Sequence, residues 1–340
     1  MDIKTDIPLA DYLTMKIGGN ADFFIDVTSV EELQQALEFA QVRQLPFFVI
    51  GGGSNIIDHD EPYKGVIIHN QIKGFETVTN TDQTTVFKIG AGEIWDDVVK
   101  RTVEMNLTGT EAMSAIPGTC GAAPVQNVGA YGQDISDTLL SLEAYDTQAG
   151  QLVELSSEDC EFSYRHSIFR GSAFGRYIIT SVTLELYKSA PEPPFYAALQ
   201  KYFDETDVTI YTPQVIRDAV TAIRATKLPD PTVKPNSGSF FKNALIAKWQ
   251  LNELLAKYPD APHYEMSNDT YKVPTGWLIE QTGLKGSLIS GMRINPDNAL
   301  VLINESATSY SDLANARDSI INTVRTMFQI TIEQEPLEIQ

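Results

Sequence analysis

The stretch that decides the fold runs from Ile116 to Gly132 and reads IPGTCGAAPVQNVGAYG. Four glycines, two prolines and three alanines leave this stretch with little side-chain bulk. Such a segment lets the backbone approach a flat or charged ligand closely, and we expect its peptide N–H groups to point at that ligand. The alternative for any isolated glycine-rich stretch is a tightly packed loop with no ligand.

A second loop of small residues, Gly51-Gly52-Gly53-Ser54-Asn55, directly follows the apolar run Phe47–Ile50. Two such loops indicate a ligand with two parts, a pyrophosphate for one loop and a ring system for the other. The second loop is not a Rossmann fingerprint, because Ile56 stands where the third glycine is needed. It is not a Walker loop either, because no Gly-Lys-Ser or Gly-Lys-Thr follows at the required spacing. We therefore expect a pyrophosphate to rest on loop amides rather than on a helix N-terminus.

The two loops together resemble those of the UDP-N-acetylenolpyruvoylglucosamine reductase family, flavoenzymes that make UDP-N-acetylmuramate for bacterial cell walls. The resemblance extends over about residues 14–335 and is to the longer branch of the family, which has a loop tyrosine. It implies noncovalently bound FAD, with NADPH as co-substrate. The FAD-binding residues that it implies are Gly51, Gly52, Gly53, Ser54, Asn55, Ile116, Pro117, Gly118, Gly121, Ala122, Asn127, Gly129 and Tyr131.

The composition is that of an ordinary globular protein, with 43% hydrophobic and 21% charged residues in a chain of 340. A formal net charge of −20 at pH 7 opposes binding to nucleic acid or to an anionic membrane. Only two cysteines and four scattered histidines occur, with no spacing typical of a metal site, so we expect no metal. The N-terminus lacks a signal peptide and no apolar run spans a membrane, which predicts a cytoplasmic protein without membrane insertion. We also expect a monomer.

The alternation of strands and helices predicts an α+β fold. The resemblance further implies a vanillyl-alcohol-oxidase (PCMH) type FAD-binding domain with a smaller α+β substrate-binding domain. We expect the FAD-binding domain at 1–188, in two subdomains completed by a C-terminal strand within 329–340. A proline-rich linker and substrate-covering loop should occupy 189–212, and the substrate-binding domain 213–328. The elements predicted from periodicity and caps are strands at 21–27, 47–50, 65–69, 85–89, 141–145, 152–155, 177–186, 299–304 and 330–339, and helices at 30–40, 94–105, 213–226, 274–281 and 312–328.

Two motifs carry the chemistry that the resemblance implies. Tyr164-Arg165-His166-Ser167 matches the family pattern in which the arginine meets the substrate carboxylate, and a planar guanidinium binds a carboxylate bidentately at any working pH. Gly238-Ser239-Phe240-Phe241, preceded by Lys-Leu-Pro-Asp-Pro, matches the motif of the family's proton donor, Ser239. Alternation in the last segment places Glu333 and Glu335 on one face, and Glu335 matches the third catalytic group. The implied substrate-binding residues are Tyr164, Tyr202, Lys227, Asn243, Tyr264 and Lys272.

Reduction of an enolpyruvyl ether explains why these residue types are needed. A hydride reaches the terminal vinyl carbon from the flavin, since the protein has no redox group of its own. Negative charge then develops on the neighbouring carbon and its carboxylate, where Arg165 and Lys227 stabilise it. Ser239 protonates that carbon, which requires neighbouring groups that stabilise the alkoxide, and Glu335 acts protonated or bridged at the carboxylate end. NADPH and the sugar nucleotide should alternate in one pocket and give ping-pong kinetics.

Two other functions are compatible with parts of the chain. A flavin oxidase of the same superfamily explains the first half but not Lys227, Ser239 or Glu335. A non-catalytic nucleotide-sugar sensor is opposed by the presence of all three catalytic candidates. Two departures from the family pattern also stand out: Pro336 directly follows Glu335 and is expected to end the strand early, and Asn295 and Asn298 replace a common His and Gln.

Overall fold

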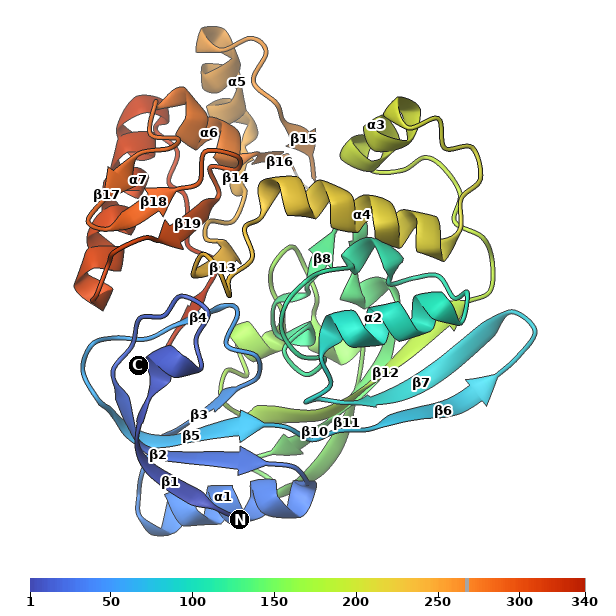
Figure 1. The fold of residues 1–340 in the computed structure, drawn as a ribbon, viewed down its shortest axis with the longest axis vertical. Coiled ribbons are helices and arrows are strands. Elements are labelled where there is room, and N and C mark those ends of the chain that lie inside the picture. Colours follow the sequence, from blue (N-terminus) through green and yellow to red (C-terminus); the bar gives the residue numbers. More distant parts are fainter. Residues whose placement is uncertain (267–268, 340) are drawn as a thin grey trace. The chain divides into compact units, whose positions relative to one another are not determined.

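A computed structural model describes residues 1–266 and 269–339. The chain forms two compact units, each assembled from several segments. The first unit comprises Met1–Ile7, Ala21–Gly53 and Lys64–Ala225, and the second comprises Pro8–Asn20, Ser54–Tyr63 and Thr226–Gln340. Figure 1 labels most of their helices and strands, and each unit is described separately below.

One sheet of the first unit carries the strand that leads to the Gly51 loop. Its strands are β1 (Ile3–Pro8), β2 (Asn20–Val27), β5 (Tyr63–Asn70) and β3 (Phe47–Ile50), in that order across the sheet. The helix α1 (Val30–Val42) connects β2 to β3, and the Ser29 side chain accepts a hydrogen bond from the N–H of Glu32, as the cap pattern predicts. Because β3 pairs in parallel with β5 and ends at Ile50, the glycine loop begins where the buried strand stops.

The second sheet of this unit is antiparallel and five-stranded, in the order β11-β10-β12-β7-β6. Its strands are β6 (Phe75–Asn80), β7 (Thr84–Gly90), β10 (Leu139–Asp146), β11 (Gln151–Ser156) and β12 (Tyr177–Tyr187). The helix α2 (Trp95–Glu104) packs its apolar face, with Trp95, Val98 and Val99, into the same buried cluster as Phe87 and Val182. The loop from Ile116 to Gly132 follows this helix and is anchored on this core.

The proline-rich segment that we predicted to be irregular contains a helix. The helix α3 (Ala197–Glu205) begins directly after the prolines and buries Leu199 and Phe203 against the apolar face of α4 (Pro213–Lys227). Proline disrupts a helix interior but does not prevent a helix from starting just beyond it, which is why composition alone misled the prediction for this segment.

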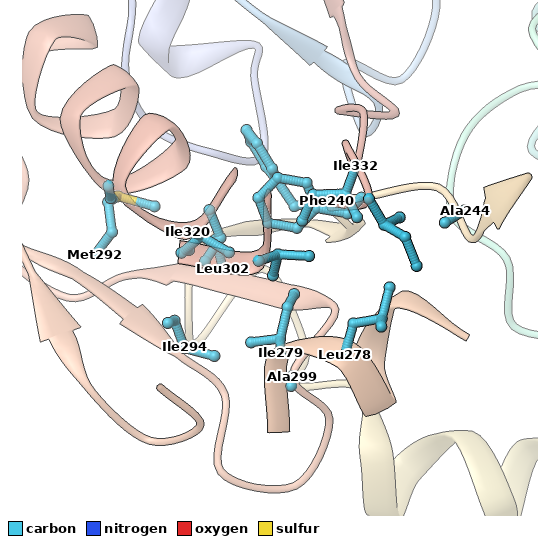
Figure 2. Close-up of a cluster of buried hydrophobic side chains, with 14 of the residues drawn as sticks. Phe240, Ala244, Leu278, Ile279, Met292, Ile294, Ala299, Leu302, Ile320 and Ile332 are labelled. Carbon is cyan, nitrogen blue, oxygen red and sulfur yellow. The ribbon is translucent and has the colours of Figure 1, made fainter. Parts of the chain in front are cut away.

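The described part of the second unit packs helices α5 to α7 with a four-stranded and a three-stranded sheet. The sheets have the orders β13-β19-β18-β17 and β14-β16-β15. Their strands are β13 (Asn236–Ser239), β14 (Ala244–Ala247), β15 (Tyr264–Glu265), β16 (Thr270–Val273), β17 (Leu288–Ile289), β18 (Met292–Ile294) and β19 (Val301–Asn304). The helices are α5 (Lys248–Lys257), α6 (Thr275–Gln281) and α7 (Tyr310–Phe328). Figure 2 shows the core that they share, with Phe240 among Leu278, Ile279, Leu302 and Ile332.

The last segment is not the continuous strand predicted at 330–339. Gln334 makes an isolated antiparallel bridge with Phe241, and the chain then forms β20 (Leu337–Glu338), which pairs in parallel with β4 (Ile56–Ile57). Pro336 lies between the two pairings and has no N–H to continue the first one. The strand is therefore interrupted at Pro336, and its two parts pair with different partners.

The unit boundaries also differ from the predicted domain boundaries at 188, 212 and 328. The helix α4 belongs to the first unit up to Ala225, because it shares a buried cluster with α3 and Tyr131. The segment 329–339 groups with the second unit, because Ile330 and Ile332 lie in that unit's core. Residue 340 lies outside the described residues.

The buried carboxyl group of Asp58 predicts a pH-dependent stability. Burial raises the pKa of Asp58 to about 6, although the N–H of Gly19 donates to Oδ2 at 3.0 Å. A raised folded-state pKa means that the neutral acid stabilises the fold at low pH and that this contribution is lost as the pH rises through about 6. We expect the free energy of unfolding to fall by about 1–2 kcal/mol over this range, after allowance for solvent screening.

Denaturant titrations at pH 4 to 7, roughly the range between the ordinary and the raised pKa, measure this loss. Asp58→Asn keeps an acceptor for Gly19 and stays neutral, so the difference in stability between the variant and the parent should grow in favour of the variant as the pH rises. A difference that stays constant with pH would show that Asp58 does not titrate in this way.

Candidate active site

The two glycine-rich loops lie against each other in the first unit. A Cβ atom on Gly52 would stand 3.1 Å from the Cα atom of Gly118, and one on Gly51 would stand 2.3 Å from Oγ1 of Thr119. Gly118 also has a φ of +117°, a conformation that side chains disfavour. The two loops can therefore approach each other this closely only because positions 51, 52 and 118 are glycine. In this respect the residues fit a dinucleotide cofactor, because the paired loops form one surface poor in side chains.

The N–H groups in the middle of the long loop do not serve as the open cradle that we expected. Those of Cys120 and Gly121 donate to the carbonyls of Glu93 and Ala91, both at 2.8 Å, and those of Ala122 and Ala123 donate to Thr119. These donors are used because the segment folds as a compact turn beside the start of α2, which the small side chains permit. The same bonds fix the position of Gly118, whose carbonyl accepts from Trp95 N–H at 3.0 Å.

Ala115, the residue before Ile116 and Pro117, has both its N–H and its carbonyl hydrogen-bonded to side chains. Ala115 has a φ of +59°, and its N–H donates to Oδ1 of Asp96 at 2.5 Å while its carbonyl accepts from Nη2 of Arg224 at 3.2 Å. Asp96 in turn receives both terminal nitrogens of Arg217, at 2.6 and 2.8 Å. The entry to the long loop is therefore held by side chains of α2 and α4.

Arg165 lies at the long loop. Tyr164 and Arg165 are the central residues of a tight turn closed by mutual backbone hydrogen bonds of Ser163 and His166, both 3.1 Å. The Arg165 guanidinium donates to the carbonyls of Gly129 at 2.8 Å and Asn127 at 3.4 Å. Its φ of +53° is unfavourable for a side-chain-bearing residue, and the two carbonyl contacts help to offset that strain.

The end of the long loop forms a small hairpin. Strands β8 (Gly129–Ala130) and β9 (Gln133–Asp134) pair, and a Cβ atom on Gly129 would collide with Asp134 at 1.6 Å. Asn127 accepts from Ser136 N–H at 3.2 Å and donates to the carbonyl of Ser163 at 3.3 Å, so its side chain ties this hairpin to the Arg165 turn.

Tyr131 at the tip of this hairpin contacts a tyrosine that the sequence analysis overlooked. Its ring meets that of Tyr196 edge-on, with centroids 5.9 Å apart, and Tyr196 is 48% exposed. The predicted loop tyrosine, Tyr202, is instead half-buried on α3 with its ring edge-on to Phe203 at 6.2 Å. The only sequence signal for Tyr196 was its place in the predicted covering loop, which it shared with Tyr202.

Ser239 and Glu335 are brought together in the second unit. The N–H of Glu335 donates to the carbonyl of Phe240 at 2.8 Å, directly after Ser239 in the chain. Gly238, with a φ of +70°, marks an irregular register between β13 and β19 that sets the direction of Ser239. Phe240 and Phe241 are fully buried, so the motif's phenylalanines anchor a half-buried serine beside a buried glutamate.

Lys227, at the end of α4, is exposed, and its backbone is held by Asn295. The buried Asn295 side chain donates to the Lys227 carbonyl at 3.1 Å. Asn298 has a local role, since its side chain accepts from Leu300 N–H at 3.2 Å. The structure thus places the two residues that depart from the family pattern at backbone contacts, which no sequence pattern indicated.

The three remaining substrate candidates lie on or beside the three-stranded sheet of the second unit. Tyr264 and Lys272 are direct cross-strand partners, and the Lys272 ammonium lies 5.6 Å from the centre of the Tyr264 ring. Asn243 accepts from the N–H of Thr275 at 3.2 Å, at the start of α6. Ser54 and Asn55, the last two residues of the Gly51 loop, belong to the second unit. The backbone carbonyl of Asn55 accepts a hydrogen bond from the N–H of Leu337 at 3.0 Å.

Two properties hold for the part of the chain that is described. No group of three or more His, Cys, Asp or Glu side chains is arranged to hold a metal ion among residues 1–266 and 269–339. Across the same residues, every helix is too short or too polar to cross a lipid bilayer.

Comparison with known proteins identifies the family. Residues 21–156 match the FAD binding domain, and residues 230–339 match the C-terminal domain of UDP-N-acetylenolpyruvoylglucosamine reductase. The reductase of Ralstonia nicotianae is 38% identical over 335 residues, covering 98% of each chain, and that of Neisseria meningitidis serogroup B is 36% identical over 334 residues, covering 98% of this chain and 96% of that one. This chain belongs to the UDP-N-acetylenolpyruvoylglucosamine reductase family. It is an FAD-dependent oxidoreductase.

Solved structures agree with the fold of this reductase family. The family member from Thermus caldophilus gives a TM-score of 0.67 at 21% identity, covering 100% of this chain and 98% of that one. The 6-hydroxy-D-nicotine oxidase of Arthrobacter nicotinovorans gives a TM-score of 0.55 at 13% identity, covering 97% and 86%. The α+β fold class, the FAD cofactor and the enzyme class predicted from the sequence are confirmed, and the predicted reduction of an enolpyruvyl sugar nucleotide is the reaction for which the family is named.

Proposed function

We propose that the protein reduces UDP-N-acetylglucosamine enolpyruvate to UDP-N-acetylmuramate for peptidoglycan synthesis, and that Arg165, Ser239 and Glu335 carry the catalysis. The glycine-rich loops would hold FAD, which would supply the hydride chemistry that links NADPH to the terminal vinyl carbon of the substrate. The two-electron reduction is completed by one proton, which the protein must deliver to the neighbouring carbon.

Ser239 is the proposed proton donor. A hydroxyl is a weak acid, so it needs nearby groups that stabilise the alkoxide until water restores the proton. Glu335 is its proposed partner at the carboxylate end of the substrate, and the observation that carries the assignment is the hydrogen bond from Glu335 N–H to the carbonyl next to Ser239, at 2.8 Å. This contact fixes the backbone of Glu335 beside that of Phe240, the residue that follows Ser239.

Arg165 is proposed to bind the substrate carboxylate and to stabilise the charge that develops on it. Its carbonyl contacts at Asn127 and Gly129 hold the guanidinium in place before the substrate arrives, and such preorganised cations lower the free energy of the charged transition state. Lys227 adds a second positive charge. Asn243, Tyr264 and Lys272 are the proposed partners of the uridine diphosphate, and Tyr164 is a further substrate contact. Against a net charge of −20, these local cations are what attracts an anionic substrate.

The loops around Gly52 and Gly118 are the proposed FAD site, with the cofactor held noncovalently. Their close approach gives a surface without side chains on which a flat ring system can lie. Ser54, Asn55, Asn127 and Tyr131 stay in the proposal as further cofactor contacts. We also propose that the protein works as a cytoplasmic monomer.

Two half-reactions test this function. The purified protein should be yellow, lose its flavin absorbance with NADPH in the absence of oxygen, and regain it when UDP-N-acetylglucosamine enolpyruvate is added. If the flavin absorbance recovers with oxygen but not with the enolpyruvyl sugar, the result would contradict a reductase and favour an oxidase. If the flavin absorbance is lost with NADPH and recovers neither with the sugar nor with oxygen, the result would favour a nucleotide-sugar sensor.

The two tyrosines of the covering segment give a matched comparison. We expect Tyr196→Phe to raise KM for the enolpyruvyl sugar about 5–10-fold, the value of one lost hydrogen bond, because Tyr196 is exposed beside Tyr131. Tyr202→Phe should change KM by less than about twofold, because that ring lies within the aromatic cluster of α3. Steady-state kinetics of both variants measures the two changes in KM. A larger increase in KM for Tyr202→Phe than for Tyr196→Phe would assign the substrate-covering role to Tyr202.

A further inference from the structure

A cluster of polar side chains surrounds Glu338 in the second unit, apart from the proposed catalytic residues. We call it the Glu338 cluster; its members are His59, Tyr310, Arg317, Gln334 and Glu338. Oε1 of Glu338 accepts from Arg317 Nη1 at 2.9 Å, Gln334 Nε2 at 2.9 Å and the Tyr310 hydroxyl at 3.1 Å. Oε2 lies 3.1 Å from Nε2 of His59, whose ring stacks on Tyr310 with centroids 3.8 Å apart.

The cluster is partly sheltered from water, which strengthens its interactions. The side chains of Arg317 and Glu338 are each 17% exposed. Burial alone would raise the pKa of Glu338, but hydrogen bonds from Gln334, His59 and Tyr310 and the charge of Arg317 hold it below its ordinary value. Glu338 is therefore an anion that binds several donors at once, and the arrangement is more than a surface ion pair.

Gln334 connects this cluster to the proposed active site. Its backbone pairs with Phe241, its amide oxygen accepts from Arg317 at 3.0 Å, and its amide nitrogen donates to Glu338. Glu335 is the next residue, and successive side chains of an extended segment point to opposite faces. Holding the Gln334 side chain on one face therefore sets the direction in which Glu335 points on the other. The segment needs such support, because Pro336 ends its backbone pairing one residue later.

We propose that Glu338 and Arg317 are positioning residues for Glu335 and act through the side chain of Gln334. The proposal rests on the catalytic role assigned to Glu335 above. Displacement of a catalytic group by about 1 Å can cost on the order of 100-fold in rate, so loss of this support should be visible in the step that uses Glu335. Loading of the flavin and its reduction by NADPH do not require Glu335 and should be unaffected.

The experiment measures both half-reactions by stopped-flow absorbance in Glu338→Gln, Gln334→Ala, the double variant and Glu335→Gln. Glu305→Gln is the matched control, because it removes a carboxylate paired with Arg293 at 2.7 Å in the same unit without touching the Glu338 cluster. Thermal unfolding, flavin content and the dissociation constant for the enolpyruvyl sugar on the oxidised enzyme are recorded for each variant.

We expect Glu338→Gln and Gln334→Ala each to slow flavin reoxidation by the sugar roughly 10–100-fold. NADPH reduction, flavin content and sugar affinity should stay within about twofold of the parent. The double variant should be no slower than the slower single variant, because both changes break one connection. Glu305→Gln should match the parent in both half-reactions. Gln334→Ala leaves the pair of Arg317 and Glu338 intact, so it tests the proposal even if Glu338→Gln does not fold.

Three results would overturn the inference. The first is reoxidation at the parental rate in both single variants. The second is a parallel loss in both half-reactions with lower thermal stability, which would mean that the cluster only stabilises the fold. The third is additive effects in the double variant. A Glu335→Gln enzyme with unchanged reoxidation would instead remove the role of Glu335 itself, and so separates failure of the proposed function from failure of the positioning role.

Discussion

Replacing Ser239 with alanine is expected to slow reoxidation of the flavin by the enolpyruvyl sugar by roughly 10²–10⁴-fold, while reduction by NADPH stays within about twofold of the parent. The loss should be this large because alanine removes the only proton that Ser239 offers to the substrate carbon. The reduction cannot then be completed by Ser239, and the proton must come from water instead.

Ser237 provides the control for this variant. It lies on the same strand, β13, and is buried, and its hydroxyl has no hydrogen-bond partner among the described residues. Ser237→Ala therefore removes the same atom without breaking a contact, and we expect parental rates in both half-reactions with a small gain or no change in stability. The comparison shows whether the effect belongs to the position of Ser239 or to any hydroxyl lost from this strand.

Stopped-flow absorbance of the flavin measures both steps on each variant. Reoxidation of Ser239→Ala at the parental rate would remove this residue from the mechanism. A loss of both half-reactions would indicate a disturbed flavin site rather than a missing proton. Deuterated water adds an independent readout. If proton transfer from the Ser239 hydroxyl limits the rate, reoxidation of the parent enzyme should be slower in deuterated water. In Ser239→Ala this contribution of the hydroxyl to the solvent isotope effect should be absent.

The elements predicted correctly are those whose cause is local. Ser29 caps α1 through Glu32, and the apolar spacing in α2 and α7 matches the faces that are buried. The alternation at 330–339 was also real, since Ile330 and Ile332 are buried, but pairing depends on partners elsewhere in the chain. The pairing of Gln334 with Phe241 ends before Pro336, because proline has no N–H to donate. The next pairing begins at Leu337, where β4 provides the partner strand.

The candidate site shows the same division between local and distant causes. Motif resemblance indicated Ser239, Arg165 and Glu335, and in the second unit the Glu335 N–H donates to the carbonyl of Phe240, the residue after Ser239. Contacts such as Asn295 with the Lys227 carbonyl join residues far apart in the chain, and no periodicity or spacing marks them. The amide groups of Cys120 to Ala123 were also assigned wrongly, because composition does not reveal that a flexible loop uses its own donors to fold.

Arg165→Lys is expected to reduce kcat/KM for the enolpyruvyl sugar by roughly 100–1,000-fold, the range found when one preorganised transition-state donor is removed. Lysine keeps the positive charge, so electrostatic attraction alone predicts little change. The structure predicts more, because one planar guanidinium spans the carbonyls of Asn127 and Gly129, a geometry that a lysine side chain does not reproduce. A single ammonium group cannot meet both carbonyls and the substrate in that geometry.

Arg170→Lys is the matched control for this variant, because Arg170 reaches the same loop through the Gln126 side chain at 2.9 Å and has no proposed role in catalysis. It should keep kcat/KM within about threefold of the parent, since one hydrogen bond to a side chain is replaceable. NADPH reduction and flavin content are measured in Arg165→Lys as well, because its guanidinium also holds the carbonyls of Asn127 and Gly129 in the long loop. Equal losses in the two lysine variants would mean that Arg165 only supports the loop, whereas a loss confined to Arg165→Lys assigns it to the substrate carboxylate.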